Sequence, residues 1–373
     1  GVRWGAGTGA YTPDAVPRAR RLPWGPEVNG VSEILADGPH HLLVLERDYS
    51  AGAGFGARLY RADLRSGSDT LGVQALQPGN HTPLQKTLLL DFATLGLATV
   101  DNLEGMTWAA PLPSGERVLV LVSDDNFNAA QSTQWLALLR HSQALAATLT
   151  AALVLGGCAA PRQPSAGNTD ARIRLLAQTH IAAGTEVLGT PWGGISGIDY
   201  DPQSGQFWLI SDDRSAHAPA RIYTARWSPA QQPTQPPHIT GVFTLLTEQG
   251  QPFPSPRQRA GSNAEVPDAE AIRWHAGRQR LWWASEGDWA RGGIPRLREA
   301  LPTGQSARDI PLPPAFTPTL QPQRTGPRPN ASLEGLALSD DGCTAWLAME
   351  MAWVQDGPRP TVQTASGPVR ITA

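Results

Sequence analysis

The sequence predicts an all-β fold, a β-propeller of five to six four-stranded blades, from three observations. A motif of two apolar strands joined by a turn recurs five times within the 373 residues. Glycine and proline, 38 and 34 residues, are abundant enough for many short strands joined by turns. The phase of the motif is fixed in three copies, where the polar residue opening the first strand and the acid ending the second are 16 residues apart: Ser196 and Asp212, Glu270 and Glu286, Glu334 and Glu350. Such periodic strand pairs are typical of propellers.

The five copies of the motif predict the inner pair of strands of each blade. They are residues 30–50, 102–131, 194–214, 268–288 and 332–352. Between them lie alternating segments that predict outer strands, at 58–64, 86–92, 133–139, 221–227 and 239–247. Residues 221–267 are long enough to contribute a sixth blade. The last strand, at 369–372, is expected to pair with the other end of the chain.

The spacing of the copies predicts a circularly permuted order. Successive copies begin about 64 to 74 residues apart, and the step from Glu334 past the end of the chain to Glu33 fits the same period. The step from Glu104 to Ser196 is longer by about 20 residues. An insertion is therefore expected between residues 131 and 172.

The inserted segment has the layout of a bacterial secretory signal. Arg140 and His141 precede an Ala/Leu-rich run at 144–155, and small residues follow, up to Cys158. Cys158 stands where a lipoprotein is cleaved and lipidated. The run is shorter than the ~20 residues that a bilayer-spanning helix needs. The alternative is an Ala-rich helix inside the fold.

A displaced signal divides the chain into three parts. We then expect residues 1–139 to be the C-terminal part of the parent propeller, 140–168 the signal-like segment and linker, and 169–373 the N-terminal part. We expect the parent to be a periplasmic or outer-membrane lipoprotein, attached to the membrane only through Cys158.

Composition excludes several classes of protein. A formal net charge of −3 and 40% hydrophobic residues fit a soluble globular domain, which we expect to be a monomer with no nucleic-acid partner. Two cysteines, Cys158 and Cys343, predict no disulfide framework. We expect Trp282 and Trp283 to pack in the core.

Several motifs together resemble the phytase-like esterase family, a group of bacterial secreted propeller proteins. They are NGVSEILADGPHHLLVLERDYS, DNLEGMTW with LVLVSDDNFN, GISGIDYDPQSGQFWLISDDR and LEGLALS. The resemblance covers nearly the whole chain once the order is rotated. It implies a propeller fold and hydrolysis of esters or phosphate esters.

Acidic residues at the strand ends are the candidate site. If the strand starts converge on the central channel, Glu33, Glu104, Glu270 and Glu334 meet there, and we expect them, with Asp124 and Asp212, to be catalytic. A second acidic ring is expected to bind metal: Asp124, Asp125, Asp212, Asp213, Glu286, Glu350, Glu46 and Asp48. Carboxylate oxygens suit Ca²⁺, whereas no His/Cys spacing suits zinc. Arg47, Arg214 and Arg221 are expected to hold the oxygens of a small phosphorylated substrate.

Structural rather than catalytic roles are the alternatives for both groups of acidic residues. The Glu-Gly pairs at strand starts could cap turns and pair with arginines. The acidic strand ends could hold structural calcium without catalysis. The function hypotheses are therefore a calcium-dependent phosphate-ester hydrolase, a non-catalytic ligand- or partner-binding propeller, and a structural lipoprotein whose acidic rings only hold metal.

Overall fold

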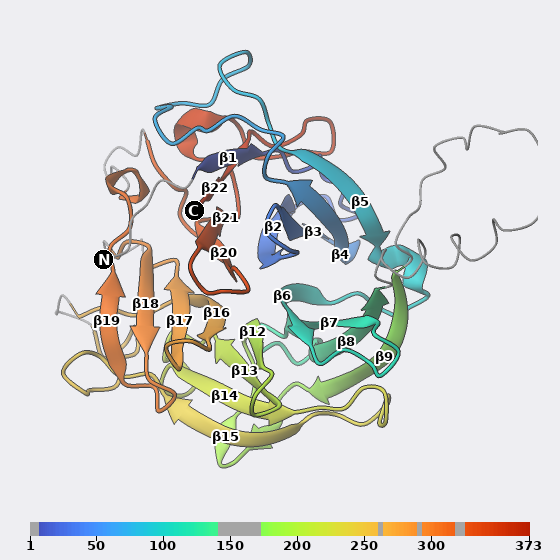
Figure 1. The fold of residues 1–373 in the computed structure, drawn as a ribbon, viewed down its shortest axis with the longest axis vertical. Helices are drawn as coiled ribbons and strands as arrows, with labels where there is room; N and C mark the ends of the chain where they lie inside the picture. Colours follow the sequence, from blue (N-terminus) through green and yellow to red (C-terminus); the bar gives the residue numbers. More distant parts are fainter. Residues whose placement is uncertain (1–6, 141–172, 260–263, 289–292, 318–324) are drawn as a thin grey trace, which may run out of the picture.

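Five antiparallel four-stranded sheets stand around a common axis, as the blades of a propeller (Figure 1). The computed structural model describes residues 7–140, 173–259, 264–288, 293–317 and 325–373. Each of the five repeated motifs forms the two innermost strands of one blade. The prediction of an all-β propeller is confirmed, with five blades.

The blades follow the chain in order, and in each the strands run from the axis outward. Blade 1 is β2 (Glu27–Ala36), β3 (His41–Ser50), β4 (Gly54–Asp63) and β5 (Gln85–Asp91). Blade 2 is β6 (Asn102–Ala109), β7 (Arg117–Asp124), β8 (Ser132–Arg140) and β9 (Ile173–Ala182). Blade 3 is β12 (Ile195–Asp201), β13 (Gln206–Ser211), β14 (Arg221–Arg226) and β15 (His238–Thr244). Blade 4 is β16 (Ala269–His275), β17 (Arg280–Ser285), β18 (Arg296–Ala300) and β19 (Ser306–Ile310).

Blade 5 is built from both ends of the chain. Its strands are β20 (Leu333–Leu338), β21 (Ala345–Met349), β22 (Val369–Thr372) and β1 (Thr8–Tyr11). β1 pairs antiparallel with β22, so the partner expected for residues 369–372 is found near the other end of the chain. This pairing closes the ring and leaves no blade with a missing strand.

No sixth blade forms in the described part of the chain. β14 and β15, which lie in the region considered for it, are the outer strands of blade 3. The remaining elements are short connections: β10 (Glu186–Val187), β11 (Thr190–Pro191), η1 (Phe92–Leu95), η3 (Pro314–Phe316) and η4 (Val354–Asp356).

Apolar side chains fill the spaces between neighbouring blades. Trp208 of blade 3 stacks on Trp274 of blade 4, with ring centroids 5.6 Å apart. Trp282 and Trp283 are buried on β17, as expected for core residues. This packing fixes the angle between blades, and therefore the place of each inner strand at the axis.

Residues 141–172, which hold most of the signal-like segment including Cys158, lie outside the described residues. The flanking strands β8 and β9 pair with each other, with Arg140 opposite Ile173. Within the described residues, the structure contains no helix with the length and apolar character that crossing a membrane requires.

Candidate functional site

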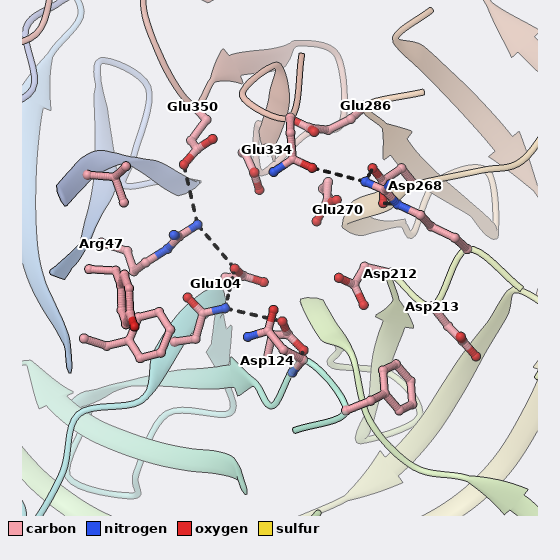
Figure 2. A pocket seen from close by; sticks show the side chains of 18 of the residues that line it. Arg47, Glu104, Asp124, Asp212, Asp213, Asp268, Glu270, Glu286, Glu334 and Glu350 are labelled. Carbon is pink, nitrogen blue, oxygen red and sulfur yellow. Dashed lines mark hydrogen bonds and ion pairs between the residues drawn. The ribbon is translucent and has the colours of Figure 1, made fainter. Parts of the chain in front are cut away.

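The five inner strands surround an acidic chamber of about 540 Å³ at one end of the propeller axis (Figure 2). We call it the chamber. All five blades contribute to its wall. Its charged residues are Arg47, Glu104, Asp124, Asp212, Asp213, Arg214, Asp268, Glu270, Glu286, Glu334, Glu350 and Arg359.

A β-bulge in every inner strand sets the first ring of side chains. The pairing register shifts by one residue in each blade, at Ser32, Glu104, Ser196, Glu270 and Glu334. A bulge turns its extra residue out of the ladder. In blades 2, 4 and 5 that residue is a glutamate that lines the chamber. In blades 1 and 3 it is a serine, which donates instead to a carbonyl of the next blade, Ser32 to Leu103 and Ser196 to Ala269.

The second strand of each blade supplies a second ring. The residues in equivalent register are Arg47, Asp124, Asp212, Glu286 and Glu350. All five line the chamber. Four blades therefore present a carboxylate, and blade 1 presents a guanidinium at the same position (Figure 2).

Arg47 connects the two acidic rings. Its Nη2 lies 3.3 Å from Glu104 Oε1 and 3.6 Å from Glu350 Oε1. The second arginine of the chamber, Arg214, is bound by both carboxylate oxygens of Asp268, with 2.6 Å between Nε and Oδ1. Arg47 is thus shared between two acids, whereas Arg214 is held by one.

Glu33 does not line the chamber, contrary to the prediction. It follows the bulged Ser32 and therefore points into the packed centre of the propeller, where it is fully buried. Its carboxylate accepts hydrogen bonds from the backbone N–H groups of Ile34 and Leu336, and pairs with Arg273 at 2.7 Å. Ser32, one residue before Glu33, therefore occupies the position that Glu104, Glu270 and Glu334 hold in their blades.

Glu46 and Asp48 also lie outside the chamber, because alternate residues of a strand face opposite sides. Glu46 accepts from the hydroxyl of Tyr11 at 2.7 Å and pairs with Lys86 at 2.6 Å. Asp48 pairs with Arg18. The ring position in this blade belongs to Arg47, which lies between them.

The second aspartate of each Ser-Asp-Asp motif shapes a loop. Asp125 accepts from the N–H groups of Phe127 and Gly194, at 3.1 and 3.0 Å. Asp213 borders the chamber, but its carboxylate is paired with Arg221.

Arg221 itself is buried and is not part of the chamber wall. It also donates to the carbonyl oxygen of Pro191 at 2.9 Å. Its contacts are therefore those of a residue that holds the fold around Asp213.

Burial and mutual repulsion raise the pKa values of the chamber carboxyls. The pKa of Glu104 rises to about 8, through burial and then the charge of Asp124. The pKa of Asp124 rises to about 7, chiefly through burial. Burial, followed by neighbouring carboxylates, also raises the pKa values of Asp212, Glu270, Glu286 and Glu334 well above their ordinary range. The chamber therefore favours either protons or a bound cation.

Two groups of three carboxylates fit a metal ion. One is Asp268, Glu270 and Glu286, the other is Glu286, Glu334 and Glu350, and within each group one oxygen per residue lies within 4.8 Å of the others. Asn102 also lines the chamber, and its buried Oδ1 has no hydrogen-bond partner among the described residues. A donor set made only of carboxylate oxygens suits a hard cation such as Ca²⁺.

Several chamber residues were not predicted. Asp268 and Asn102 occupy equivalent places before the bulge of their blades, a signal that was present in the repeat. Among the other lining residues, Tyr49 and Phe55 pair across β3 and β4, whereas Phe127 and His217 lie in the loops that follow β7 and β13. No repeat-based pattern identifies them.

Comparison with solved structures finds matches at low sequence identity. The crystal structure of a GH43_1 enzyme from Xanthomonas citri matches with 13% identity and a TM-score of 0.43, covering 92% of this chain and 87% of that one. The structure of U3-55K matches with 9% identity and a TM-score of 0.35, covering 99% and 98%. The RRP9 WD40 repeats match with 10% identity and a TM-score of 0.34, covering 97% and 99%.

Comparison with curated proteins finds no match. The family described as phytase-like, esterase-like activity of phytase, matches residues 3–127 and 190–373. These two ranges hold all five repeated motifs apart from the last residues of the second, and together they make up most of the chain. The chain therefore belongs to the phytase-like family.

Proposed function

We propose that this protein is a calcium-dependent hydrolase of phosphate esters. The observation that carries the proposal is the cluster of carboxylates from blades 4 and 5, facing an arginine from blade 1 in one chamber. A cation and a guanidinium that line the same chamber suit the oxygens of a phosphate group. Membership of the phytase-like family supports ester hydrolysis as the reaction class.

Five carboxylates would hold the calcium. They are Asp268, Glu270, Glu286, Glu334 and Glu350, of which Glu286 belongs to both metal-binding groups. Calcium supplies charge neutralisation, polarises a phosphoryl oxygen and lowers the pKa of a water that it binds. Arg214 already pairs with Asp268, and so helps to hold that ligand in place.

Arg47 would orient the substrate. Its two ion pairs, at 3.3 and 3.6 Å, are longer than the best charge-assisted hydrogen bonds of about 2.7–2.9 Å. A phosphate oxygen would compete well for the same N–H groups. Arg47 would then bring the phosphate beside Glu104, whose raised pKa of about 8 keeps a proton available for the leaving alcohol near neutral pH.

The test is hydrolysis of bis(4-nitrophenyl) phosphate and 4-nitrophenyl phosphate by the purified chain, with calcium and then with excess chelator. We expect release of 4-nitrophenol that stops with chelator and returns with calcium. Absence of turnover in calcium, while calcium still raises the melting temperature, would contradict the hydrolase. That outcome would favour a propeller that binds calcium and a ligand without catalysis.

A further inference from the structure

The balance of charge in the chamber limits how many phosphates a substrate can carry. Among the described residues, nine carboxylates and three arginines line it. Arg214 is already bound by Asp268, and Arg359 is exposed at the rim. This leaves Arg47 as the arginine of the inner wall that faces two acids rather than one. A substrate with several phosphates would bring more negative charge than these side chains neutralise.

An aromatic pair at the chamber wall offers a different kind of contact. The rings of Phe127 and His217 are stacked, with centroids 4.2 Å apart and an angle of 15° between their planes. Both line the chamber, and His217 is exposed. A second aromatic pair, Tyr49 and Phe55, lines the same chamber from blade 1. The wall therefore combines charged and aromatic surface.

The ring of Phe127 packs closely against the backbone at Gly193 and Gly194. A Cβ atom on Gly193 or Gly194 would lie within 2.8 and 2.7 Å of its ring, so only glycine leaves room for it there. The guanidinium of Arg221 lies 5.9 Å from the ring centre. The Phe127 ring is thus confined on one side by this backbone, and His217 stacks on it.

His217 is fixed by its own loop. Asp213 accepts hydrogen bonds from the N–H groups of Ala216, His217 and Ala218, at 3.1, 2.8 and 2.9 Å. Arg214 and Ser215 adopt left-handed φ angles of 52° and 55°, which non-glycine residues rarely adopt without a compensating role. The same short loop carries Asp212 into the chamber. The backbone that carries His217 is therefore held by Asp213, and its imidazole is placed by stacking on Phe127.

We propose that His217, supported by Phe127, is a stacking ledge for a flat organic group of the substrate. The substrate class is then an ester with a single phosphate group and an aromatic or similarly planar arm. This inference deepens the proposed function and rests on it for the place of the phosphate. A planar group stacks on an imidazole face with little loss of side-chain freedom, because the ring is already held.

The test uses phosphonates, which bind without being hydrolysed. Calorimetric titration of the calcium-loaded protein compares phenylphosphonate, methylphosphonate and 1,3-phenylenediphosphonate. We expect phenylphosphonate to bind about 3- to 10-fold more tightly than methylphosphonate, as a stacking contact provides. We expect the diphosphonate to bind more weakly than phenylphosphonate, because its second anionic group enters a chamber in which nine carboxylates face three arginines.

Three variants test whether the preference for phenylphosphonate over methylphosphonate depends on His217. His217→Ala is expected to abolish the preference for the phenyl group, and His217→Phe to keep it. His238→Ala removes an exposed histidine of β15, outside the chamber, and is expected to change nothing. Equal affinities for phenyl- and methylphosphonate, absence of binding of both probes, or a preference that survives His217→Ala would overturn the proposal. So would tighter binding of the diphosphonate.

The outcome separates this proposal from the proposed function. A phenyl preference that depends on His217, without hydrolysis of either nitrophenyl ester, would leave the ledge in place and refute the hydrolase. Calcium-dependent hydrolysis without the preference would keep the hydrolase and refute the ledge.

Discussion

At the scale of single residues, neighbouring carboxylates of one motif have opposite surroundings. Asp212 lines the chamber among other acids, and burial with this repulsion raises its pKa. The carboxylate of Asp213, the next residue, is buried and forms an ion pair with the buried Arg221. Loss of the two carboxylates should therefore change the free energy of unfolding by different amounts, although the two residues are adjacent in the sequence.

Asn substitutions at Asp212 and Asp213 are predicted to have different effects on the free energy of unfolding. Asp213→Asn leaves Arg221 buried without its charge partner, and we expect a loss of about 3–5 kcal/mol in the free energy of unfolding. Asp212→Asn removes one of several repelling charges, and we expect little loss or a gain in stability of the calcium-free protein. Urea unfolding in chelator measures both. Equal destabilisation by the two variants would contradict the assignment.

Arg47 is predicted to act on the substrate and not on the metal. We expect Arg47→Gln to lower kcat/KM for bis(4-nitrophenyl) phosphate by about 10²-fold, as loss of a charged contact to a phosphoryl oxygen does. Calcium affinity should not fall, because a positive charge leaves the chamber. A variant with normal turnover and weakened calcium binding would reverse the roles assigned to Arg47.

At the scale of elements, the inner strands approach one another so closely that the residue after the bulge is normally small. Gly105, Gly197 and Gly335 occupy this position in blades 2, 3 and 5, and a Cβ on each would lie 2.9 to 3.0 Å from its nearest neighbour. Blade 1 carries Glu33 there instead. Its partner Arg273 donates to the carbonyl oxygens of Ile34, Ile198 and Ile272, at 2.9, 2.7 and 2.9 Å, and so ties three inner strands together.

Breaking this central pair is predicted to cost more than replacing it. Arg273→Met leaves Glu33 buried without its cation, and we expect a loss of about 3–5 kcal/mol in unfolding free energy. The double variant Glu33→Gln with Arg273→Met should recover part of that loss, because no buried charge remains. Urea unfolding of the four proteins of this cycle gives the coupling. Additive effects would show that the pair is not coupled.

The sequence predicts the positions of the strands well, because the motif recurs, but it does not predict which side chains of a strand face the chamber, because that depends on the pairing register. The recurring motif predicts all five inner strand pairs, and of the four acids expected to meet at the strand starts, Glu104, Glu270 and Glu334 line the chamber. The first repeat has a shorter turn, so its spacing predicts Glu33 and Glu46 for the two rings, whereas the pairing register places Ser32 at the bulge and Arg47 in the second ring. Charge alone also suggested Asp125, Asp213 and Arg221, whose orientation depends on strand alternation. His217 lies in the loop after β13, beyond the motif at 194–214, so the repeat does not predict it.

At the scale of the whole molecule, five blades hold like charges together at one end of the axis. The folded protein binds protons on Glu104 and Asp124 with pKa values of about 8 and 7, above the values of roughly 4 in an unfolded chain. A raised pKa of an acid means that the folded state takes up protons more readily. Stability of the calcium-free protein therefore increases as pH falls from about 8 toward 5.

We accordingly predict that, in chelator, the melting temperature is higher at pH 6 than at pH 8.5. Calcium replaces the protons as counter-charge, so its stabilising effect should be larger at pH 8.5. Differential scanning calorimetry at both pH values, with and without calcium, checks both statements. A calcium-free protein that is less stable at pH 6, or equally stable at both, would contradict the account of the acidic rings.

The most direct test of the central claim is the rate of bis(4-nitrophenyl) phosphate hydrolysis against free calcium, in the wild type and in Glu286→Gln. Glu286 belongs to both groups of metal-binding carboxylates, and the substitution keeps its size. We predict saturation with calcium in the wild type, and in the variant a calcium requirement raised at least tenfold or activity lost. Hydrolysis that is independent of calcium, or unchanged in Glu286→Gln, would contradict the account.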